Sequence, residues 1–347
     1  MKAVFVTKGT RELKDFPVPT PAAGEVLIKN VAVSSNPKDY KIPMWIAGYG
    51  SIEGNDVAGH VEAVGEGVTK FKKGDKVAAF SKMFSGDKWG AYAEYTVAPA
   101  NTTFALGPKT AYEEAAALPL AYITAAIGLF LRLGLPTPDA PASGADAPAV
   151  LIYGAATTVG VYATQLAKKA GLYVVGVASS TELATSYGCD EVIDYRGKST
   201  ADLVDAIVAA GGGRIHHVYD AVSEGGTLEI VSAALSRTGG SGGGRAQGRF
   251  THVLPYSEEQ LAALPQGVTA HHTSCNTAYE GDSDFAEHWF ARVGEWIERG
   301  EFKSQRVTVV PGGLAGVEEG LRRLQQHEVK GEKLVYRIGE TPGLSSA

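Results

Sequence analysis

The first part of the chain alternates apolar and polar positions over short stretches. Four segments carry β-branched and aromatic residues between Gly, Asn, Asp and Pro breakers, namely EVLIKNVAVSSN, DVAGHVEAVG, GDKVAAF and WGAYAEYTVAP. Strands with this pattern bury one face, and the breakers between them mark turns. We therefore predict a β-rich, barrel-like domain over roughly the first 110 residues.

A different pattern begins at Tyr112. The segment AYEEAAALPLAYITAAIGLFLRLG is apolar around most of a helix and is expected to be buried. Beyond it, the apolar strands AVLIYG, YVVGVAS, EVIDY and HHVYDAV alternate with helical segments such as TVGVYATQLAKKAG. Strands that are apolar on both faces and separated by helices predict a doubly wound α/β domain around a parallel sheet.

The end of the chain returns to the first domain in this prediction. DFAEHWFARVGEWIERGEF has the period of an amphipathic helix, and GEKLVYRIG that of a strand which can rejoin the first sheet. The fold class is thus α/β with two domains, because the length exceeds what one core usually organises. We place residues 1–122 and 284–347 in the β-rich domain and residues 123–283 in the doubly wound domain.

Composition and charge restrict the partners of the protein. The chain holds 32 basic and 38 acidic residues, a net charge of −6, which argues against nucleic acid or an anionic membrane as its ligand. Two cysteines are too few for a disulfide framework, and the start MKAVFVTKGT lacks the long apolar run of a signal or anchor. We expect a cytoplasmic protein that acts on small molecules.

The segment VLIYGAATTVGVYATQLAKKAG, residues 150–171, predicts a strand, a turn of small residues and a helix. A dinucleotide turn needs small residues so that the backbone and the helix amides can approach a pyrophosphate. Thr157 and Thr158 stand where glycines are usual, and we expect their hydroxyls and amides to donate to phosphate oxygens. The predicted cofactor contacts of this turn are Gly154, Ala155, Ala156, Thr157, Thr158 and Val159. The alternative is a strand-to-helix turn that binds nothing.

The second predicted strand ends in VVGVASSTELA, with Ser179 and Ser180 where an acidic residue would bind the ribose of NAD. Because hydroxyls tolerate a 2′-phosphate and a carboxylate repels it, we predict NADPH as the cofactor and Ser179 and Ser180 as contacts. The alternative is that both serines only cap the following helix.

Several motifs together carry a family resemblance. These are NPKDYK, EGNDVAGHVEAVGEGV, KKGDKVAAF, EEAAALPLAYITA, GAATTVGVYATQLAK, EVIDYR and GEKLVYRI. Their order resembles the medium-chain dehydrogenase/reductase superfamily, in its zinc-free quinone oxidoreductase and enoyl reductase branch. The run LRLGLPTPDAPASGADAPAVLIYG further resembles fungal trans-acting enoyl reductases that serve polyketide synthases. The resemblance implies a GroES-like first domain, an inserted Rossmann domain and an active site in the cleft between them.

Zinc alcohol dehydrogenases of this superfamily carry an early catalytic Cys and a His-Glu pair. This chain has Ser34 and Ser35 near the first position and Asn55 and Asp56 at the second. Zinc prefers thiolate and imidazole ligands. We therefore expect no metal site.

A reaction without a metal favours conjugate reduction, in which charge develops on a carbonyl oxygen as an enolate. The expected activity is NADPH-dependent reduction of an activated C=C in an enone, a quinone or an enoyl thioester. Two alternatives stay open: a trans-acting enoyl reductase that meets the acyl-carrier domain of a polyketide synthase, and an NADPH-binding protein with little turnover. The chain could act as a monomer or as a homodimer.

The resemblance also implies site residues. In the NPxDxK stretch, Asn36 would hydrogen-bond the nicotinamide ribose, and Lys41 would orient a thioester carbonyl or donate a proton. Tyr49 resembles the suggested proton donor of mitochondrial enoyl reductases. The alternatives are a solvated surface lysine and a packing aromatic residue.

Further cofactor contacts follow from the same resemblance. Thr124 would face the nicotinamide or its ribose, and Tyr195 would flank the adenosine 2′-phosphate. Val253 and Leu254 would close over the nicotinamide ribose, and Lys333 would reach the edge of the cofactor.

Overall fold

A computed structural model describes residues 1–144, 147–238 and 248–344 of the chain. It divides into two compact units. Unit 1 comprises Met1–Ile123 and Asn276–Ala347, and unit 2 comprises Thr124–Cys275. No helix of the described part is long and apolar enough to cross a membrane.

Unit 1 is built on two sheets. The larger has seven strands in the order β15-β16-β3-β5-β6-β8, and β7 also pairs with β3. The smaller has the order β2-β1-β4. The strands are β1 (Lys2–Thr7), β2 (Arg11–Asp15), β3 (Glu25–Ser34), β4 (Gly50–Ile52), β5 (Asp56–Val64), β6 (Lys76–Phe80), β7 (Tyr95–Pro99), β8 (Thr103–Ala105), β15 (Val307–Val309) and β16 (Lys333–Arg337).

The pairing of β3 with β5 holds the centre of this sheet. Val26, Ile28 and Val33 on β3 are fully buried and share one core with Val57 and Val61 on β5. Strand β16 runs antiparallel to β3, so the last predicted strand does rejoin the first domain. The pattern of apolar positions thus predicted these strands, but the central strands β3 and β5 are buried at consecutive positions, so both of their faces are covered.

The helices of unit 1 are α1 (Lys38–Trp45), α2 (Tyr112–Ala116), α9 (Ser283–Glu298) and α10 (Val317–Gln325), and α3 (Pro119–Ala126) crosses the boundary to unit 2. The segment predicted as one buried helix is therefore two α-helices followed by a π-helix, Ile127–Arg132. Pro119 explains the break, because proline disfavours helical geometry at the residue before it and suits the first position of a new helix.

Residues 276–283 belong to unit 1 and not to the doubly wound domain in which the sequence pattern put them. The Tyr279 hydroxyl accepts a hydrogen bond from the Met83 amide at 2.9 Å, and the Asn101 amide group donates to the Ala278 carbonyl at 3.1 Å. These long-range contacts tie the segment to the first domain, and no local pattern announces them.

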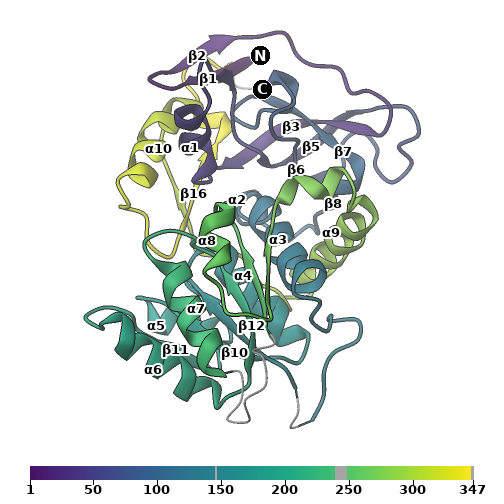
Figure 1. Cartoon of the computed structure of the whole chain (residues 1–347). Coiled ribbons are helices and arrows are strands. Elements are labelled where there is room, and N and C mark those ends of the chain that lie inside the picture. The colour runs from purple at the N-terminus through teal and green to yellow at the C-terminus, as the bar shows by residue number, and fades with distance from the viewer. Residues whose placement is uncertain (145–146, 239–247, 345–347) are drawn as a thin grey trace. The chain divides into compact units, whose positions relative to one another are not determined.

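Unit 2 is a parallel six-stranded sheet in the order β11-β10-β9-β12-β13-β14. Its strands are β9 (Ala149–Tyr153), β10 (Tyr173–Val177), β11 (Glu191–Ile193), β12 (Ile215–Asp220), β13 (Gly248–His252) and β14 (Val268–His272). Its helices are α4 (Thr158–Lys169), α5 (Thr181–Ser186), α6 (Thr200–Gly211), α7 (Thr227–Thr238) and α8 (Glu258–Ala262). Figure 1 labels β10, β11 and β12 of this sheet together with helices α4 to α8. The chain order reverses at β9, which lies between β10 and β12 and marks the switch point where such sheets bind ligands.

Both faces of this sheet are covered. Ala149, Leu151 and Tyr153 on β9 share a core with residues of α6 and α7, whereas Val150 and Ile152 point to the other face and are also fully buried. This burial explains why the strands are apolar at consecutive positions. The predicted doubly wound domain is confirmed.

Candidate active site

The turn after β9 requires glycine at its first position. Gly154 has a φ of +82°, and a Cβ added there would lie 2.5 Å from Cγ2 of Val222. A Cβ on Gly160, the third residue of α4, would lie 2.1 Å from the Gly154 carbonyl oxygen. The turn and the helix therefore approach each other as closely as backbone allows. A dinucleotide turn needs this close approach.

The two threonines of the turn have different roles. Thr157 is the N-cap of α4, and its hydroxyl accepts from the Gly160 amide at 3.1 Å. The Thr157 amide donates to the Gly154 carbonyl at 2.9 Å, so this amide is used within the turn. The amides of Thr158 and Val159 lie in the first helical turn, where the helix offers them no acceptor. The residues present fit a pyrophosphate, because these two amides need an acceptor from outside the helix.

The carboxyl ends of neighbouring strands bring further predicted contacts to the same edge of the sheet. Ser179 and Ser180 follow β10, and Tyr195 follows β11, with Val177 paired to Ile193 between them. Ser180 is the N-cap of α5, but its side chain makes no capping hydrogen bond in the described structure, so the capping alternative is not seen. Tyr195 is 43% exposed. A hydroxyl pair and an open aromatic face therefore lie at this edge.

The predicted nicotinamide end of unit 2 is held by buried polar groups. Asp220, the last residue of β12, accepts from the amides of Val222 and Ser223 and from the Thr227 hydroxyl, while burial raises the pKa of its carboxyl group. The Ser223 hydroxyl accepts from the Val253 amide at 3.0 Å. The loops after β12 and β13 are thus fixed to each other.

Two further predicted contacts in unit 2 are Leu254 and Thr124. The Leu254 carbonyl, one residue beyond Val253, accepts from the His252 ring at 2.7 Å. Thr124 is 5% exposed, and its carbonyl accepts from the Tyr219 hydroxyl at 2.8 Å. Both residues are held in place by backbone contacts.

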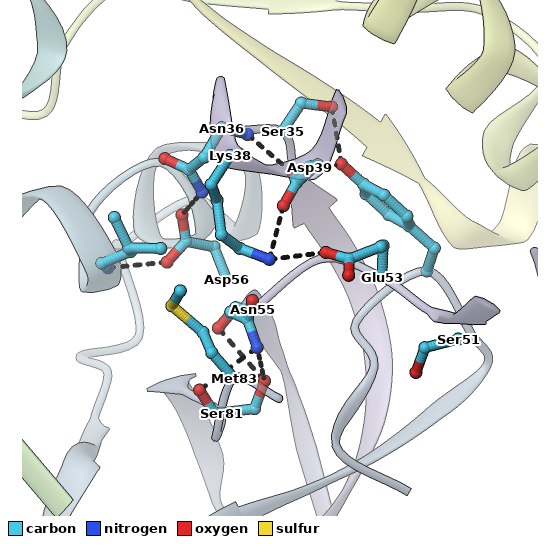
Figure 2. A network of polar contacts seen from close by, with 12 residues as sticks. Ser35, Asn36, Lys38, Asp39, Ser51, Glu53, Asn55, Asp56, Ser81 and Met83 are labelled. Atoms are coloured by element: carbon cyan, nitrogen blue, oxygen red, sulfur yellow. Dashed lines mark hydrogen bonds and ion pairs between the residues drawn. The ribbon is translucent and has the colours of Figure 1, made fainter. Parts of the chain in front are cut away.

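In unit 1, a buried network is centred on Asp56, the first residue of β5. One carboxylate oxygen accepts from Asn36 at 2.7 Å and from the Ser34 hydroxyl at 3.2 Å, and the other accepts from the Leu120 amide at 2.7 Å. Lys333 Nζ lies 2.5 Å from Asn36 Oδ1 and 3.3 Å from Asp56 Oδ2. Figure 2 shows Asn36 facing Asp56. Lys333, predicted at the cofactor edge, is thus directed to Asn36 and Asp56.

The residues at the positions where zinc alcohol dehydrogenases carry their ligands do not fit a zinc ion. Asp56 already accepts four hydrogen bonds, one of them from an ammonium group. The Asn55 amide group donates to Ser81 and to the Lys82 carbonyl, away from Asp56. Serine and asparagine offer neither the thiolate nor the imidazole that zinc prefers. Across the described residues, no three His, Cys, Asp or Glu side chains gather as a metal site would require.

A second buried cluster joins α1 to the segment after β4. Lys38 Nζ lies 2.8 Å from Asp39 and 2.6 Å from Glu53, and Figure 2 shows it between the two carboxylates. Burial alone would lower the pKa of Lys38, but the two carboxylates outweigh burial and raise it above its usual value. Lys38 is therefore fully charged at neutral pH.

Tyr49 and Tyr92 complete this cluster. The Tyr49 hydroxyl donates to Glu53, and the Tyr92 hydroxyl donates to Asp39 at 2.5 Å. Burial and the adjacent carboxylate raise the pKa of both phenols above their usual value. The backbone amide of Asn36 also donates to Asp39, at 2.8 Å. Asn36 therefore links this cluster to the Asp56 network, which its side chain contacts.

A cavity of about 330 Å³ in unit 1 opens beside these clusters. Its walls include Lys38, Tyr49 and Glu53 from the second cluster, Asn55 and Lys82, and the apolar side chains of Ile42, Ile46, Met83 and Phe84. Of the predicted catalytic residues, Tyr49 lines this cavity, Asn36 lies behind it in the buried network, and Lys41 lies half-buried on α1, outside the lining.

Sequence reasoning missed Lys38 and Glu53. Lys38 lies in the quoted NPKDYK stretch, where the resemblance directed attention to Lys41 instead. Glu53 precedes the Gly-Asn-Asp run, which stands where zinc alcohol dehydrogenases carry a His-Glu pair. The only sequence signal was a charged residue inside each of two segments that the resemblance had already singled out.

Two family models match the chain. The model described as alcohol dehydrogenase GroES-like domain matches residues 22–108, within unit 1. The model described as zinc-binding dehydrogenase matches residues 158–241, within unit 2. Both of the expected domain types are therefore found.

Similar proteins extend over nearly the whole chain. The trans-enoyl reductase fsr4 of Gibberella fujikuroi is 33% identical over 91% of this chain and 92% of its own. A putative zinc-dependent alcohol dehydrogenase from Rhizobium etli superposes with a TM-score of 0.82 at 26% identity, over 100% of this chain and 99% of that chain. A mycobacterial protein, Rv1454c, solved in complex with NADPH, has a TM-score of 0.74 at 24% identity, over 96% of this chain and 99% of its own.

Three observations point to the same protein family: the fold, the glycine-dependent turn of unit 2 and the relatives that match nearly the whole chain. The sheet order and the two matched domains are those of one oxidoreductase superfamily, and the identity to a curated relative extends through both domains. The chain belongs to the medium-chain dehydrogenase/reductase superfamily.

Proposed function

We propose that this protein is an NADPH-dependent reductase that delivers hydride to an activated C=C bond in an enone, a quinone or an enoyl thioester. The observation that carries the proposal is the similarity to a trans-enoyl reductase at 33% identity over 91% of the chain. In this proposal unit 2 holds the cofactor and the cavity of unit 1 holds the substrate.

The chemistry of the buried residues supports conjugate reduction over reduction of an isolated carbonyl. The positions that would supply soft zinc ligands carry Asn55 and Asp56, and Asp56 is committed to an ion pair with Lys333. Conjugate reduction delocalises the developing charge as an enolate, which a single hydrogen-bond donor can stabilise. Conjugate reduction therefore needs less charge stabilisation from the protein than reduction of an isolated carbonyl, which forms an alkoxide.

The residues of unit 1 would protonate the substrate and position the substrate and the cofactor. Bound NADPH supplies the hydride. Tyr49, on the cavity wall, would protonate the α-carbon, and Glu53 would keep the Tyr49 proton in place until then. Asn36, fixed by Asp56 and Lys333, would position the nicotinamide ribose, and Lys41 would orient a thioester carbonyl.

NADPH is proposed over NADH because of the residues after β10 and β11. The Ser180 hydroxyl is not used in capping α5, and the ring of Tyr195 is exposed. The residue after Tyr195, Arg196, is bound to Asp194, whose pKa it lowers to about 2. The serine hydroxyls would therefore donate to the 2′-phosphate, with the Tyr195 ring and the Arg196–Asp194 pair beside it.

Two other functions remain candidates. The name of the relatives favours a trans-acting enoyl reductase that reduces chains held by a synthase. A binding protein with little turnover is the second, because no side chain of the described site is one that only catalysis would explain.

One assay separates these functions. The full-length protein is mixed with NADPH and a panel of enones, quinones and crotonyl thioesters, and cofactor oxidation is followed at 340 nm. Oxidation with at least one acceptor is expected. Tight NADPH binding without oxidation by any acceptor would leave only the binding protein, and reaction with thioesters alone would favour the synthase partner.

A further inference from the structure

We propose that Lys82 forms an anion subsite in the cavity of unit 1, so that the substrate carries a carboxylate or a phosphate in addition to its reducible bond. This inference rests on the proposed function, since it assigns the substrate class of the same cavity. The juxtaposition that supports it is an uncompensated ammonium group held on two aromatic faces at the wall of a cavity.

The charges around the cavity are unevenly compensated. Three ionised side chains line it, Lys38, Glu53 and Lys82. Lys38 is paired with both Asp39 and Glu53. Among the residues that the structure describes, no carboxylate pairs with Lys82. Lys82 is therefore the cation of this wall that an incoming anion can neutralise.

Aromatic rings fix the position of this ammonium. Lys82 Nζ lies 4.7 Å from the centre of the Trp89 ring and 5.9 Å from that of Tyr279. The Lys82 backbone is also held, because its carbonyl accepts from Asn55 at 3.0 Å. A cation–π contact attracts an ammonium group but leaves its net charge in place. The side chain is thus ordered in advance, which reduces the entropy cost of binding an anion.

Lys88 provides an internal comparison. Its Nζ lies 4.5 Å from the centre of the same Trp89 ring, yet it is neutralised by Glu25 at 2.9 Å and lies outside the cavity lining. Two lysines therefore share one ring, and of the two only Lys82 lines the cavity and lacks a carboxylate partner among the described residues.

The rest of the lining defines the remainder of the ligand. Ile42, Ile46 and Phe84 are apolar wall residues, and Ile46 and Phe84 are 43% and 56% exposed. A ligand with an apolar body and one anionic end would cover these side chains and reach Lys82. A carboxylate on an enone acid and the phosphate of a phosphopantetheine thioester share this chemistry.

The test uses pairs of acceptors that differ by one charge. 4-Oxo-2-hexenoate is compared with its methyl ester, and crotonyl-4′-phosphopantetheine with crotonyl-pantetheine. For each pair the ratio of kcat/KM, anionic over neutral, is measured with NADPH. We expect Lys82→Gln to lower the ratio at least about tenfold for the pair whose anion the subsite takes, as loss of a charge-assisted hydrogen bond would. Lys82→Arg should restore it, and Lys88→Gln should leave it unchanged.

A binding measurement keeps the proposal testable without turnover. The saturated analogues, 4-oxohexanoate and butyryl-4′-phosphopantetheine, are titrated against the protein, and binding is followed by tryptophan fluorescence, since Trp89 lies under Lys82. A Lys82-dependent dissociation constant with no NADPH oxidation would retain the subsite and reject the reductase. The subsite would be overturned if Lys82→Gln left the ratios and the dissociation constants unchanged. It would also be overturned if Lys88→Gln lowered the ratios and raised the dissociation constants as much as Lys82→Gln does.

Discussion

The ammonium group of Lys333 donates to Asn36 at 2.5 Å, although 297 positions separate the two residues in the chain. The same ammonium lies 3.3 Å from Asp56, and all three side chains are less than 5% exposed. A C-terminal strand therefore provides the cation that fixes a residue of the N-terminal NPKDYK stretch. This relationship leads to the first prediction.

Lys333→Met should lower the free energy of unfolding of unit 1 by about 3–5 kcal/mol, because it leaves the Asp56 carboxylate buried without its cation. The four tryptophans, Trp45, Trp89, Trp289 and Trp296, all lie in unit 1, so their fluorescence during urea unfolding reports on this unit. The double variant Lys333→Met/Asp56→Asn should lose less than Lys333→Met alone. A double variant as unstable as the sum of the single changes would contradict the ion pair.

Tyr92→Phe should make stability less sensitive to alkaline pH. Burial and Asp39 raise the pKa of Tyr92 well above 10 in the folded protein, so above pH 10 the folded state holds a proton that the unfolded state loses. Stability linked to this proton is present in full below pH 10 and decreases as the pH rises toward the folded pKa. Replacing Tyr92 with Phe should therefore reduce the fall in the free energy of unfolding above pH 10 by about 1.4 kcal/mol per pH unit.

The measurement is a series of urea titrations between pH 9 and pH 11. Tyr195→Phe is the matched control, because Tyr195 is 43% exposed and lies in unit 2. Equal slopes in wild type and Tyr92→Phe would show that the buried phenol does not hold its proton against solvent.

Gly154→Ala should weaken NADPH binding roughly tenfold or more, because the residue must keep a φ of +82° and its Cβ would collide with Val222. Cofactor fluorescence gives the dissociation constant. Gly144→Ala is the control, since Gly144 has a φ of +86° with nothing within 4 Å of its Cβ. If both variants bind NADPH equally, the turn after β9 is not the phosphate site.

Ser180→Asp should shift cofactor preference toward NADH, by roughly tenfold in the ratio of the two dissociation constants, because a carboxylate repels the 2′-phosphate. Ser186→Asp, on the exposed end of α5, adds the same charge away from the carboxyl edge of β10. An unchanged ratio in Ser180→Asp would place the 2′-phosphate elsewhere.

Tyr49→Phe should lower kcat for C=C reduction by about 100-fold while leaving the dissociation constant of NADPH unchanged, because it removes a general acid from the cavity wall. Lys41→Ala should instead raise KM for thioesters. Stopped-flow and steady-state assays with one enone and one crotonyl thioester distinguish the two effects. Full activity of Lys41→Ala on every acceptor would remove Lys41 from the mechanism.

The sequence by itself determined both domain types and the grouping of the residues proposed to bind the cofactor. Period-two alternation identified the strands of unit 1, and consecutive apolar positions identified the parallel sheet of unit 2, because both patterns record local burial. Gly154, Ser180 and Tyr195 lie within three residues of the ends of β9, β10 and β11, and the carboxyl ends of parallel strands meet at one edge. Their grouping could therefore be predicted from chain order alone.

Only the tertiary structure decided how the charges of unit 1 are paired. The sequence did not show that Lys333 pairs with Asp56 or that Lys38 joins Asp39, Glu53 and, through Glu53, Tyr49. Lys82 contacts the rings of Trp89 and Tyr279, and among the described residues no carboxylate pairs with it. The sequence does not show whether a charged side chain has a partner of opposite charge. Its partners come from distant segments, and burial in the folded core is what makes each pairing energetically decisive.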